Sequence, residues 1–529
     1  MGNSEAEPLG AWIPDAAVSG YARSDIIAIG VQESTYKLKK GHVPLVSMIQ
    51  ERLGPDYAFI EQAVCGQIKL MIWARVEMVG PENMWSVDTS FKATGIGHVL
   101  RNKGGVAVAL RYNYTRFAFV CAHLEAHEGR EHAQRRDTSI YDIFSGCQVG
   151  ERSLDLNSQF HHVFFFGDLN YRVEVPQLKH LDHKIVAKTV QGIAEQGRYA
   201  DIICGDELLW HLAQQRILAG FVTGECAWPP TFKRVKGSRD GYNLKRVPSY
   251  CDRVLFKSLP GLESDLTLIE YEACDDFISS DHKPVRAQFV MKAIPDIETS
   301  LFATGTPHIQ ISNLRGAGLV LEYGGVHVEG LQTSDPYVTF YTIPPWAYQP
   351  PKGPSGKGAG KRQCTSVAKS TVNPVWDDVV DLEIKASDLN DVFLILKVVD
   401  QNNKLVDHDQ SIGTVIFSLK RIMSETGEDE EHYFSEPIRW GGVCRGVLTG
   451  TLCLSYNDGA AAAASSPMGG INLMNKDRRS QSVGMGNRRS SLSNLLGGLS
   501  KLTKQASHLP QNTTIDDIRQ SESSGMETL

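Results

Sequence analysis

The feature that most constrains the fold is a series of short, nearly continuous apolar runs within residues 1–292. Each run is about six residues long, which is typical of strands that are buried on both faces. Longer polar stretches separate the runs, and residues 131–158 and 178–217 have the apolar spacing of helices. We therefore predict a layered α/β domain with its sheets in the middle. The runs are 25–30, 70–74, 106–110, 117–121, 162–167, 253–256 and 285–290.

The pattern changes near Pro295, and two further segments follow it. Residues 300–456 contain mostly strand-like runs with turn residues between them, which predicts a second, all-β sandwich domain. Residues 457–529 are rich in Ala, Ser, Gly and Asn and include a basic stretch, so we expect a disordered tail. The sequence therefore predicts two folded domains followed by a basic, Ser-rich tail.

Charge and composition exclude several classes of protein. Lysine and arginine number 54 and the acidic residues 61, a formal net charge of −7, whereas a protein that coats nucleic acid through bulk charge would be basic. We expect no nucleic-acid partner. No apolar run is long enough to span a membrane, and the ten cysteines form no CxxC pair. These features predict a cytoplasmic protein with reduced thiols.

Polar side chains stand at the ends of several predicted strands. A lone Asp after a strand is usually a turn former or a helix cap, and a lone His is more often a surface or core residue. Several such signals in one domain favour a site, because carboxylates suit a hard cation and His and Asn suit anionic oxygens. The candidates are Glu33, His123, Asp168, Asn170, Asp252, Asp281 and His282.

These motifs, in this order, resemble the inositol polyphosphate 5-phosphatases. The two family signatures are FFFGDLNYR (164–172) and PSYCDRVL (248–255), and their sequences are most similar to those of the SHIP-type enzymes. TGIGHVLRNKGGV (94–106), AHLEAH (122–127) and SSDHKPV (279–285) extend the resemblance. It implies a four-layer α/β sandwich of the endonuclease/exonuclease/phosphatase type, a fold shared with metal-dependent nucleases and sphingomyelinases.

The resemblance also implies roles for individual residues. Glu33 matches the family's Mg²⁺ ligand, and Mg²⁺ needs only one or two protein carboxylates because it keeps several waters. Asp168 matches the residue that orients and deprotonates the attacking water. Asn170 would donate to a phosphate oxygen, and His123 would contact the same phosphate.

His282 would hold the phosphoryl oxygens while charge builds on them. A carboxylate partner would fix its tautomer, and the sequence leaves two candidates for that partner, Asp252 and Asp281. Cys251 lies inside a signature but has no CX₅R loop around it, so no phosphocysteine route is expected.

The family reads a neighbouring 4-phosphate with residues of two further segments. PPTFKR offers Phe232 and Lys233, and LKRVPSY offers Lys245 and Arg246. Phe232 stands where the family has a tyrosine, so the strength of 4-phosphate binding stays open. Lys103, in the sequence NKGG, is a further substrate-binding candidate; as a lone lysine it is equally well a surface charge.

The second domain resembles a C2 domain through TSDPYVTFY (333–341), TVNPVWDD (371–378) and VVDQNNKLVDHDQSIG (398–413). C2 calcium sites use about five Asp carboxylates, because Ca²⁺ takes six to eight oxygens. The sequence leaves both a calcium site and its absence open. A basic loop, residues 352–362, offers a calcium-free route to anionic lipid. The candidate calcium ligands are Asp335, Asp400, Asp407 and Asp409.

Together these features predict a Mg²⁺-dependent phosphatase that removes the 5-phosphate from phosphatidylinositol 3,4,5-trisphosphate, 4,5-bisphosphate or both, as a peripheral membrane protein. Two alternatives stay open: a catalytically weak C2 scaffold that binds lipid, and another phosphodiesterase on the same fold. The chain begins with MGN, which in the family belongs to the end of a first strand whose Asn helps to bind Mg²⁺. We therefore expect that strand and its Asn to lie upstream of Met1. Oligomeric state and the tail's protein partners stay open.

Overall fold

The computed structural model of the chain describes residues 9–13, 24–34, 44–80, 83, 85–95, 101–178, 180–294, 306–320, 334–348, 350, 362–386, 389–401, 409–427 and 429–457. These residues all belong to one compact unit, Met1–Ala462. Among them, no helix is both long and apolar enough to cross a membrane. The predicted tail lies outside the described residues apart from Asn457, and so does the basic loop apart from Arg362.

Two sheets form the centre of the first domain. A three-stranded antiparallel sheet has the order β1-β3-β2, and a six-stranded sheet has the order β4-β5-β6-β7-β9-β8. In the larger sheet only the β6–β7 pair is parallel, and helix α2 lies in the crossover between these two strands. The bounds are β1 (Ile26–Val31), β2 (Tyr57–Cys65), β3 (Ile68–Arg75), β4 (Trp85–Ala93), β5 (Gly104–Tyr112), β6 (Thr115–His123), β7 (His162–Asp168), β8 (Val222–Thr223) and β9 (Asp252–Ser258).

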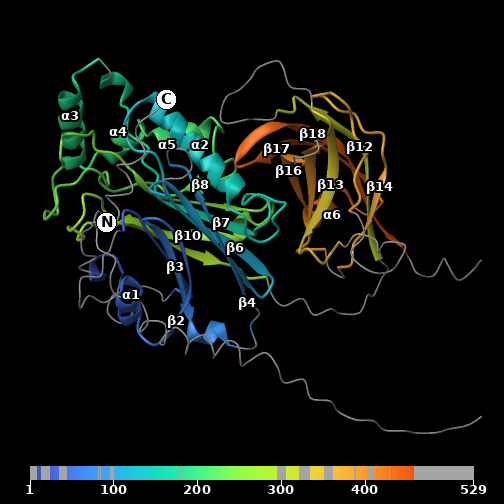
Figure 1. Ribbon diagram of the computed structural model, residues 1–529, viewed down its shortest axis with the longest axis horizontal. Helices are drawn as coiled ribbons and strands as arrows, with labels where there is room; N and C mark the ends of the chain where they lie inside the picture. Colours follow the sequence, from blue (N-terminus) through green and yellow to red (C-terminus); the bar gives the residue numbers. More distant parts are fainter. Residues whose placement is uncertain are drawn as a thin grey trace, which may run out of the picture. The chain divides into compact units, whose positions relative to one another are not determined.

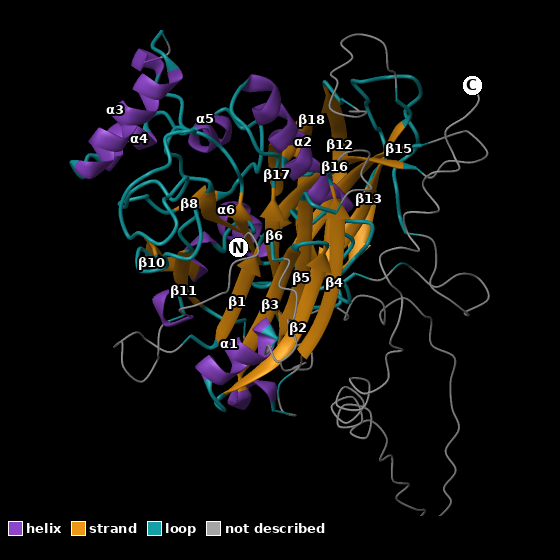
Figure 2. Ribbon diagram, turned by 60° about the vertical axis from the view of Figure 1, so that its left-hand side comes forward, coloured by secondary structure: helices purple, strands orange, loops and turns teal. Residues whose placement is uncertain are grey.

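Strand alternation explains why the domain has four layers. In β3, Leu70 faces a core between the two sheets, while Trp73 faces a second core that includes Ile49 of helix α1. In β5, Val106 joins the core between the sheets and Ala107 joins a third core with α2. Because each central strand buries both faces, the order is helix, sheet, sheet, helix (Figure 2). The predicted four-layer α/β fold is confirmed.

The helices are shorter than the apolar spacing predicted. The stretch 131–158 is helical only as far as Gly146, and the stretch 178–217 divides into three helices. Asp182 and Asp206 explain two of these boundaries, because each side chain accepts a hydrogen bond from the first turn of the helix it precedes. The α-helices are α1 (Leu45–Leu53), α2 (Arg130–Gly146), α3 (His183–Glu195), α4 (Tyr199–Ile203) and α5 (Glu207–Ala213). The 3₁₀ turns are η1 (Leu9–Ala11), η2 (Val76–Val79), η4 (Pro176–Leu178) and η5 (Glu263–Asp265).

The domain's last strands form a separate hairpin. β10 (Leu266–Ala273) and β11 (Val285–Met291) pair with each other in an antiparallel two-stranded sheet. Within the described residues, neither β11 nor β1 pairs with a strand on its second edge.

The second domain is an antiparallel, seven-stranded curled sheet with the order β13-β15-β16-β17-β18-β12-β14 (Figure 1). Its interior contains the buried Trp376, whose indole nitrogen donates to the Pro336 carbonyl at 3.2 Å. The predicted all-β domain is therefore confirmed. Its elements are β12 (Thr306–Ala317), β13 (Pro336–Ile343), β14 (Val380–Glu383), β15 (Phe393–Asp400), β16 (Gln410–Ser418), α6 (Leu419–Thr426), β17 (Glu431–Trp440) and β18 (Val443–Asn457).

Residues of both domains share one small apolar core. Leu154 and Leu259 of the first domain pack with Ile343 and Phe393 of the second. Since these side chains are almost fully buried, the contact is part of the folded interior.

A glycine turn of the second domain also inserts into the first. Gly441 and Gly442 connect β17 to β18, both with positive φ. The Gly441 amide donates to the buried Asp155 carboxylate at 2.7 Å, and the Gly442 carbonyl accepts from the Ala219 amide at 2.9 Å. A Cβ at Gly441 would collide with the Tyr141 ring, so only glycine allows this approach.

Replacing Trp376 by alanine tests the second core. The loss of a fully buried tryptophan should lower the free energy of unfolding by about 3–5 kcal/mol. Tyr433→Ala is the control, because this side chain is 70% exposed and its removal should change stability by less than about 0.5 kcal/mol. Urea titrations of both variants measure the difference, and equal stabilities would contradict the assigned core.

Candidate active site

Strand register gathers the predicted polar residues at one edge of the large sheet. His123 ends β6, Asp168 ends β7 and Asp252 begins β9. His123 is the register partner of Asp168, and Asp168 is the register partner of Asp252. Lys103 comes directly before Gly104, the register partner of His123 on β5. Four neighbouring strands therefore present four functional groups side by side.

Gly167 allows β6 and β7 to approach closely just before this edge. Its φ is 135°, and an added Cβ would collide with the carbonyl oxygen of Ala122. The glycine in the GD pair of the first signature is therefore required by the backbone of the neighbouring strand.

Asp168 is the buried centre of the site. Its Oδ1 atom accepts from the backbone N–H of Asn170 at 3.1 Å. Its Oδ2 atom lies 3.3 Å from Nε2 of His123 and 3.9 Å from Nε2 of His282. Burial acts to raise the pKa of Asp168, but His282, His123 and Lys103 outweigh it and hold that pKa well below its usual range. Asp168 is therefore ionised at every physiological pH.

His282 is paired with Asp252. The Nδ1 atom of His282 lies 2.9 Å from Oδ2 of Asp252, and the Thr231 hydroxyl donates to the same oxygen at 2.7 Å. Burial acts to lower the pKa of His282, but Asp252 and Asp168 outweigh it and raise the pKa to about 9. At neutral pH the ring is therefore an imidazolium whose Nε2–H faces Asp168.

Asp281, one of the two candidate partners of His282, instead binds lysines. Its carboxylate accepts from Lys233 at 2.8 Å and lies 3.7 Å from Lys236. Burial acts to raise its pKa, but Lys233 outweighs it and lowers the pKa. Of the two carboxylates left open for His282, Asp252 makes the hydrogen bond.

Asn170 is held in place by Arg172, a residue that the sequence reasoning missed. The guanidinium donates to the Asn170 side-chain oxygen at 2.7 Å and to its backbone carbonyl at 2.9 Å. The side-chain amide nitrogen of Asn170 donates to the Leu124 carbonyl at 3.1 Å, which leaves its second side-chain hydrogen for a ligand. The Phe232 ring lies between Arg172 and His282, with its centroid 4.8 Å from the guanidinium and 4.5 Å from the imidazole. Arg172 stands inside the GDLNYR motif, and that position could have identified it from the sequence. Phe232, already named as a candidate, stands in PPTF.

Lys103 lies inside the site. Its ammonium is 2.5 Å from Nε2 of His123, the atom that also faces Asp168. Burial lowers the pKa of Lys103, although Asp168 and Glu33 act against this effect. One ring nitrogen cannot accept from Lys103 and donate to Asp168 together, so Lys103 and Asp168 compete for His123.

A buried ion pair and a half-buried hydrogen-bonded carboxylate contact the GDLNYR loop. Arg136 of α2 binds Glu207 of α5 at 2.6 Å, and Glu207 also accepts from the Arg172 amide at 2.9 Å. Asp137 accepts from Tyr171 at 2.6 Å and binds His211 at 2.7 Å. These partners lie far apart in the sequence, so no local motif could reveal them.

The remaining predicted substrate residues, Lys245 and Arg246, form no hydrogen bond or ion pair with this cluster among the described residues. Lys245 is exposed, and Arg246 donates to the Lys245 carbonyl at 3.1 Å.

The donor set fits a magnesium ion. Within the described part of the chain, the one group of three possible ligand atoms lying within 4.8 Å of one another belongs to Asp168, Asp252 and His282. His282 is protonated and bonded to Asp252, so this trio is a hydrogen-bonded cluster. Glu33 follows β1 as an exposed carboxylate whose charge acts on Lys103. Asp168 acts on the same lysine, and an exposed carboxylate such as Glu33 would suit Mg²⁺, which keeps most of its waters.

The described candidate calcium ligands of the second domain already have protein partners. Lys369 donates to Oδ2 of Asp335 at 3.0 Å, and the Ser370 amide donates to Oδ1 at 2.8 Å. Asp400 accepts from the Asp335 amide at 2.6 Å, and Asp409 accepts from the Tyr337 hydroxyl. A lysine ammonium therefore holds the carboxylate that a calcium ion would need. Asp407 lies outside the described residues.

The ion pair of His282 can be tested by titration. We expect its ring protons to titrate near pH 9 in NMR spectra, and Asp252→Asn to shift the midpoint downward by more than one pH unit. Because the folded pKa lies above the ordinary histidine pKa of 6.5, this pair stabilises the fold fully below about pH 6.5, and that stability is lost as pH rises through about 9. Asp276→Asn, at an exposed carboxylate, is the control. An unchanged midpoint in Asp252→Asn would contradict the pairing.

Comparison with known proteins adds family membership to this geometry. Residues 2–288, more than half of the chain, match the family described as Endonuclease/Exonuclease/phosphatase family 2, and residues 309–435 match the C2 domain. One relative is phosphatidylinositol 3,4,5-trisphosphate 5-phosphatase 1 of Xenopus laevis, 26% identical over 460 residues, which cover 83% of this chain and 41% of the relative. Another is phosphatidylinositol 3,4,5-trisphosphate 5-phosphatase 2 of Mus musculus, 32% identical over 442 residues, which cover 80% and 32%. The chain thus spans about two fifths or less of the length of these relatives.

A solved structure is also similar, the inositol polyphosphate 5-phosphatase domain of spsynaptojanin with inositol (1,4)-bisphosphate and calcium ion. It is 23% identical, its TM-score is 0.45, and the match covers 55% of this chain and 83% of that one. The resemblance expected from the signatures is confirmed by the family match and by the names of the relatives. The chain belongs to the endonuclease/exonuclease/phosphatase family 2 and carries a C2 domain after its catalytic fold.

Proposed function

We propose that the chain is a Mg²⁺-dependent phosphatase that removes the 5-phosphate of phosphatidylinositol polyphosphates. The observation that carries this proposal is the buried Asp168, ionised beside His123 and a protonated His282. The names of the relatives support phosphatidylinositol 3,4,5-trisphosphate as substrate, with 4,5-bisphosphate as the second candidate.

In this mechanism each residue acts on the phosphate or on the attacking water. Asp168 accepts a hydrogen bond from the water and orients its lone pair toward phosphorus; because its pKa is so low, it takes the proton only as the new P–O bond forms. The bond between phosphorus and the inositol 5-oxygen breaks as the new bond forms, and the leaving oxygen takes a proton from solvent. His282 donates from Nε2 to a phosphoryl oxygen, and Asp252 keeps its ring charged and aligned. The remaining side-chain amide hydrogen of Asn170 would give a second donor to the same group. Mg²⁺, which Glu33 would hold, supplies neutralisation of the phosphate charge.

The C2 domain would bring this site to its lipid substrate. We propose that the protein works at the cytoplasmic face of membranes, where anionic lipids attract basic segments. The contact of Lys369 with Asp335 supports docking without calcium. Such recruitment raises the local substrate concentration and leaves the chemistry unchanged.

Loss of either central residue should abolish hydrolysis. Asp168→Asn and His282→Gln should each lower phosphate release from phosphatidylinositol 3,4,5-trisphosphate by about 10²–10⁴. Both changes conserve size, so circular dichroism and thermal unfolding should show a folded protein. Asp276→Asn should keep native activity, and EDTA should remove activity that Mg²⁺ then restores. Full activity in a folded Asp168→Asn protein would refute the assigned role.

Lys369 offers a separate test of calcium independence. Calorimetry should detect no Ca²⁺ binding to the native second domain, and vesicle binding should be the same with Ca²⁺ and with EGTA. Lys369→Gln frees Oδ2 of Asp335 and should allow weak Ca²⁺ binding. Lys420→Gln, at an exposed lysine of α6, should behave like the native chain. Micromolar Ca²⁺ binding to the native chain would contradict the proposal.

A further inference from the structure

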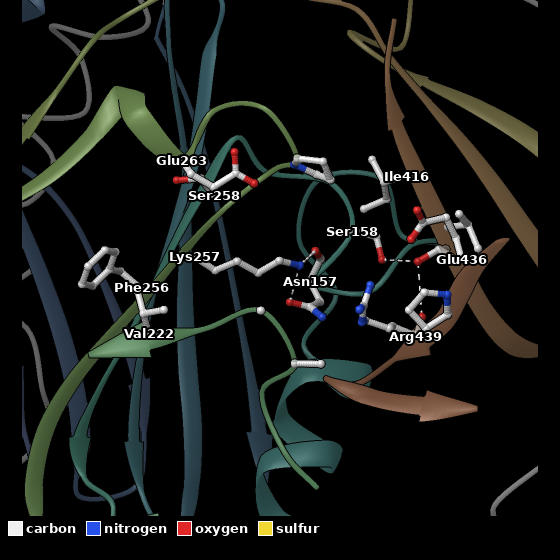
Figure 3. Close-up of a pocket in the computed structure, with 16 residues that line it drawn as sticks. Asn157, Ser158, Val222, Phe256, Lys257, Ser258, Glu263, Ile416, Glu436 and Arg439 are labelled. Atoms are coloured by element: carbon white, nitrogen blue, oxygen red, sulfur yellow. Dashed lines mark hydrogen bonds between the residues drawn. The ribbon is translucent and has the colours of Figure 1, made fainter. Parts of the chain in front are cut away.

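A cavity of about 340 Å³ lies between the catalytic domain and the C2 domain (Figure 3). One wall comes from β8, β9 and the residues before β7, and the other from β16 and β17. None of the residues assigned to the active site lines it. The cavity is therefore a separate feature of the molecule.

Two cations approach this cavity from opposite walls. Figure 3 shows Lys257 of β9 and Arg439 of β17 pointing toward one another across it. The Lys257 ammonium donates to both the backbone and the side-chain oxygen of Asn157, each at 2.9 Å. These acceptors are neutral, so the positive charge of Lys257 is bonded but not neutralised.

No carboxylate pairs with either cation within the described part of the chain. Asp155 is the nearest buried acid, but its oxygens accept from the Ser158 hydroxyl and the Gly441 amide. Burial and, to a smaller extent, Arg439 lower the pKa of Lys257 to about 8, although Asp155 and Glu263 act against them. Lys257 is still mostly protonated at pH 7, so two like charges face one cavity.

An anion between the two charges would relieve their repulsion. Arg439 offers a planar donor fork, and Lys257 keeps a third ammonium hydrogen. A tetrahedral phosphate has oxygens enough to accept from both groups together. The cavity is about ten times the volume of one water, so it also has room for an organic group on the phosphate, beside the apolar Val222, Phe256 and Ile416.

We propose that this cavity binds a phosphate monoester or orthophosphate between Lys257 and Arg439. Because the two cations belong to different domains, the bound phosphate joins the C2 domain to the catalytic domain. Glu263 and Glu436 also line the cavity, but both are exposed, so solvent screens their repulsion of a bound phosphate. The inference does not depend on the reaction proposed for the active site.

Calorimetry on the full chain tests the site directly. Orthophosphate and glycerol 3-phosphate are titrated at constant ionic strength into the native chain, Lys257→Gln, Arg439→Gln and the control Lys420→Gln. The active site is intact in all four proteins, so a difference among them reports on the cavity. We expect each cavity variant to lose one binding event or to weaken it about tenfold or more, because a hydrogen bond to a charged group is removed. Arg439→Lys should recover part of the affinity.

Vesicle binding then separates the two sources of the phosphate. Vesicles with phosphatidic acid, a lipid monoester, are compared with phosphatidylglycerol vesicles of equal surface charge. A loss confined to the soluble titrations identifies free phosphate or a soluble ester, and a selective loss on phosphatidic acid identifies a lipid headgroup; either supports the site. Equal affinities of all four folded proteins for every probe would overturn it. Thermal unfolding confirms folding, and Lys257→Gln decides the case if Arg439→Gln does not fold.

Discussion

The active site depends on one unfavourable situation, a fully ionised aspartate inside the protein. Asp168 is 6% exposed, and a carboxylate in such a place is stable only when positive charge surrounds it. His282, His123 and Lys103 supply that charge, and Asp252 in turn keeps His282 protonated. Each of these groups therefore needs the next. Lys103, His123, Asp168 and Asp252 stand at adjacent strand ends, where the sheet register fixes their spacing more tightly than a loop could. His282 comes from the segment just before β11.

The same charges separate the proposed role of Asp168, a base, from that of His282, a hydrogen-bond donor. A carboxylate with a pKa this low is a weak base in the resting site, whereas the imidazolium beside it is a ready donor. A phosphate dianion entering between them would reverse the local charge and raise the proton affinity of Asp168. The substrate would thus complete the base that acts on it, which fits a site that stabilises the transition state more than the ground state.

Much of this arrangement could be predicted from the sequence, because short apolar runs mark buried strands and polar residues at their ends mark a site. Other parts could not. Asp281 is adjacent to His282 in the chain, yet Asp252, 30 residues away, makes the hydrogen bond. Phe232 forms β-bridges with both Ser249 and His282, and these long-range bridges bring the two segments together. Helix lengths were overestimated, since the spacing of apolar residues does not report where a capping aspartate begins a new helix. The contact of Asp155 with Gly441 joins residues 286 positions apart, and no local pattern encodes it.

The glycine turn that carries Gly441 and Gly442 has a consequence for how such a protein can change over time. The two domains touch through a shared core and an inserted backbone, so neither surface is an ordinary exterior. A C2 domain from another protein, with any side chain at the turn, would collide with Tyr141 and with the backbone at Leu218. A C2 domain exchanged into this junction would therefore need glycine at both turn positions, and a substitution there would require a matching change near Tyr141 or Leu218.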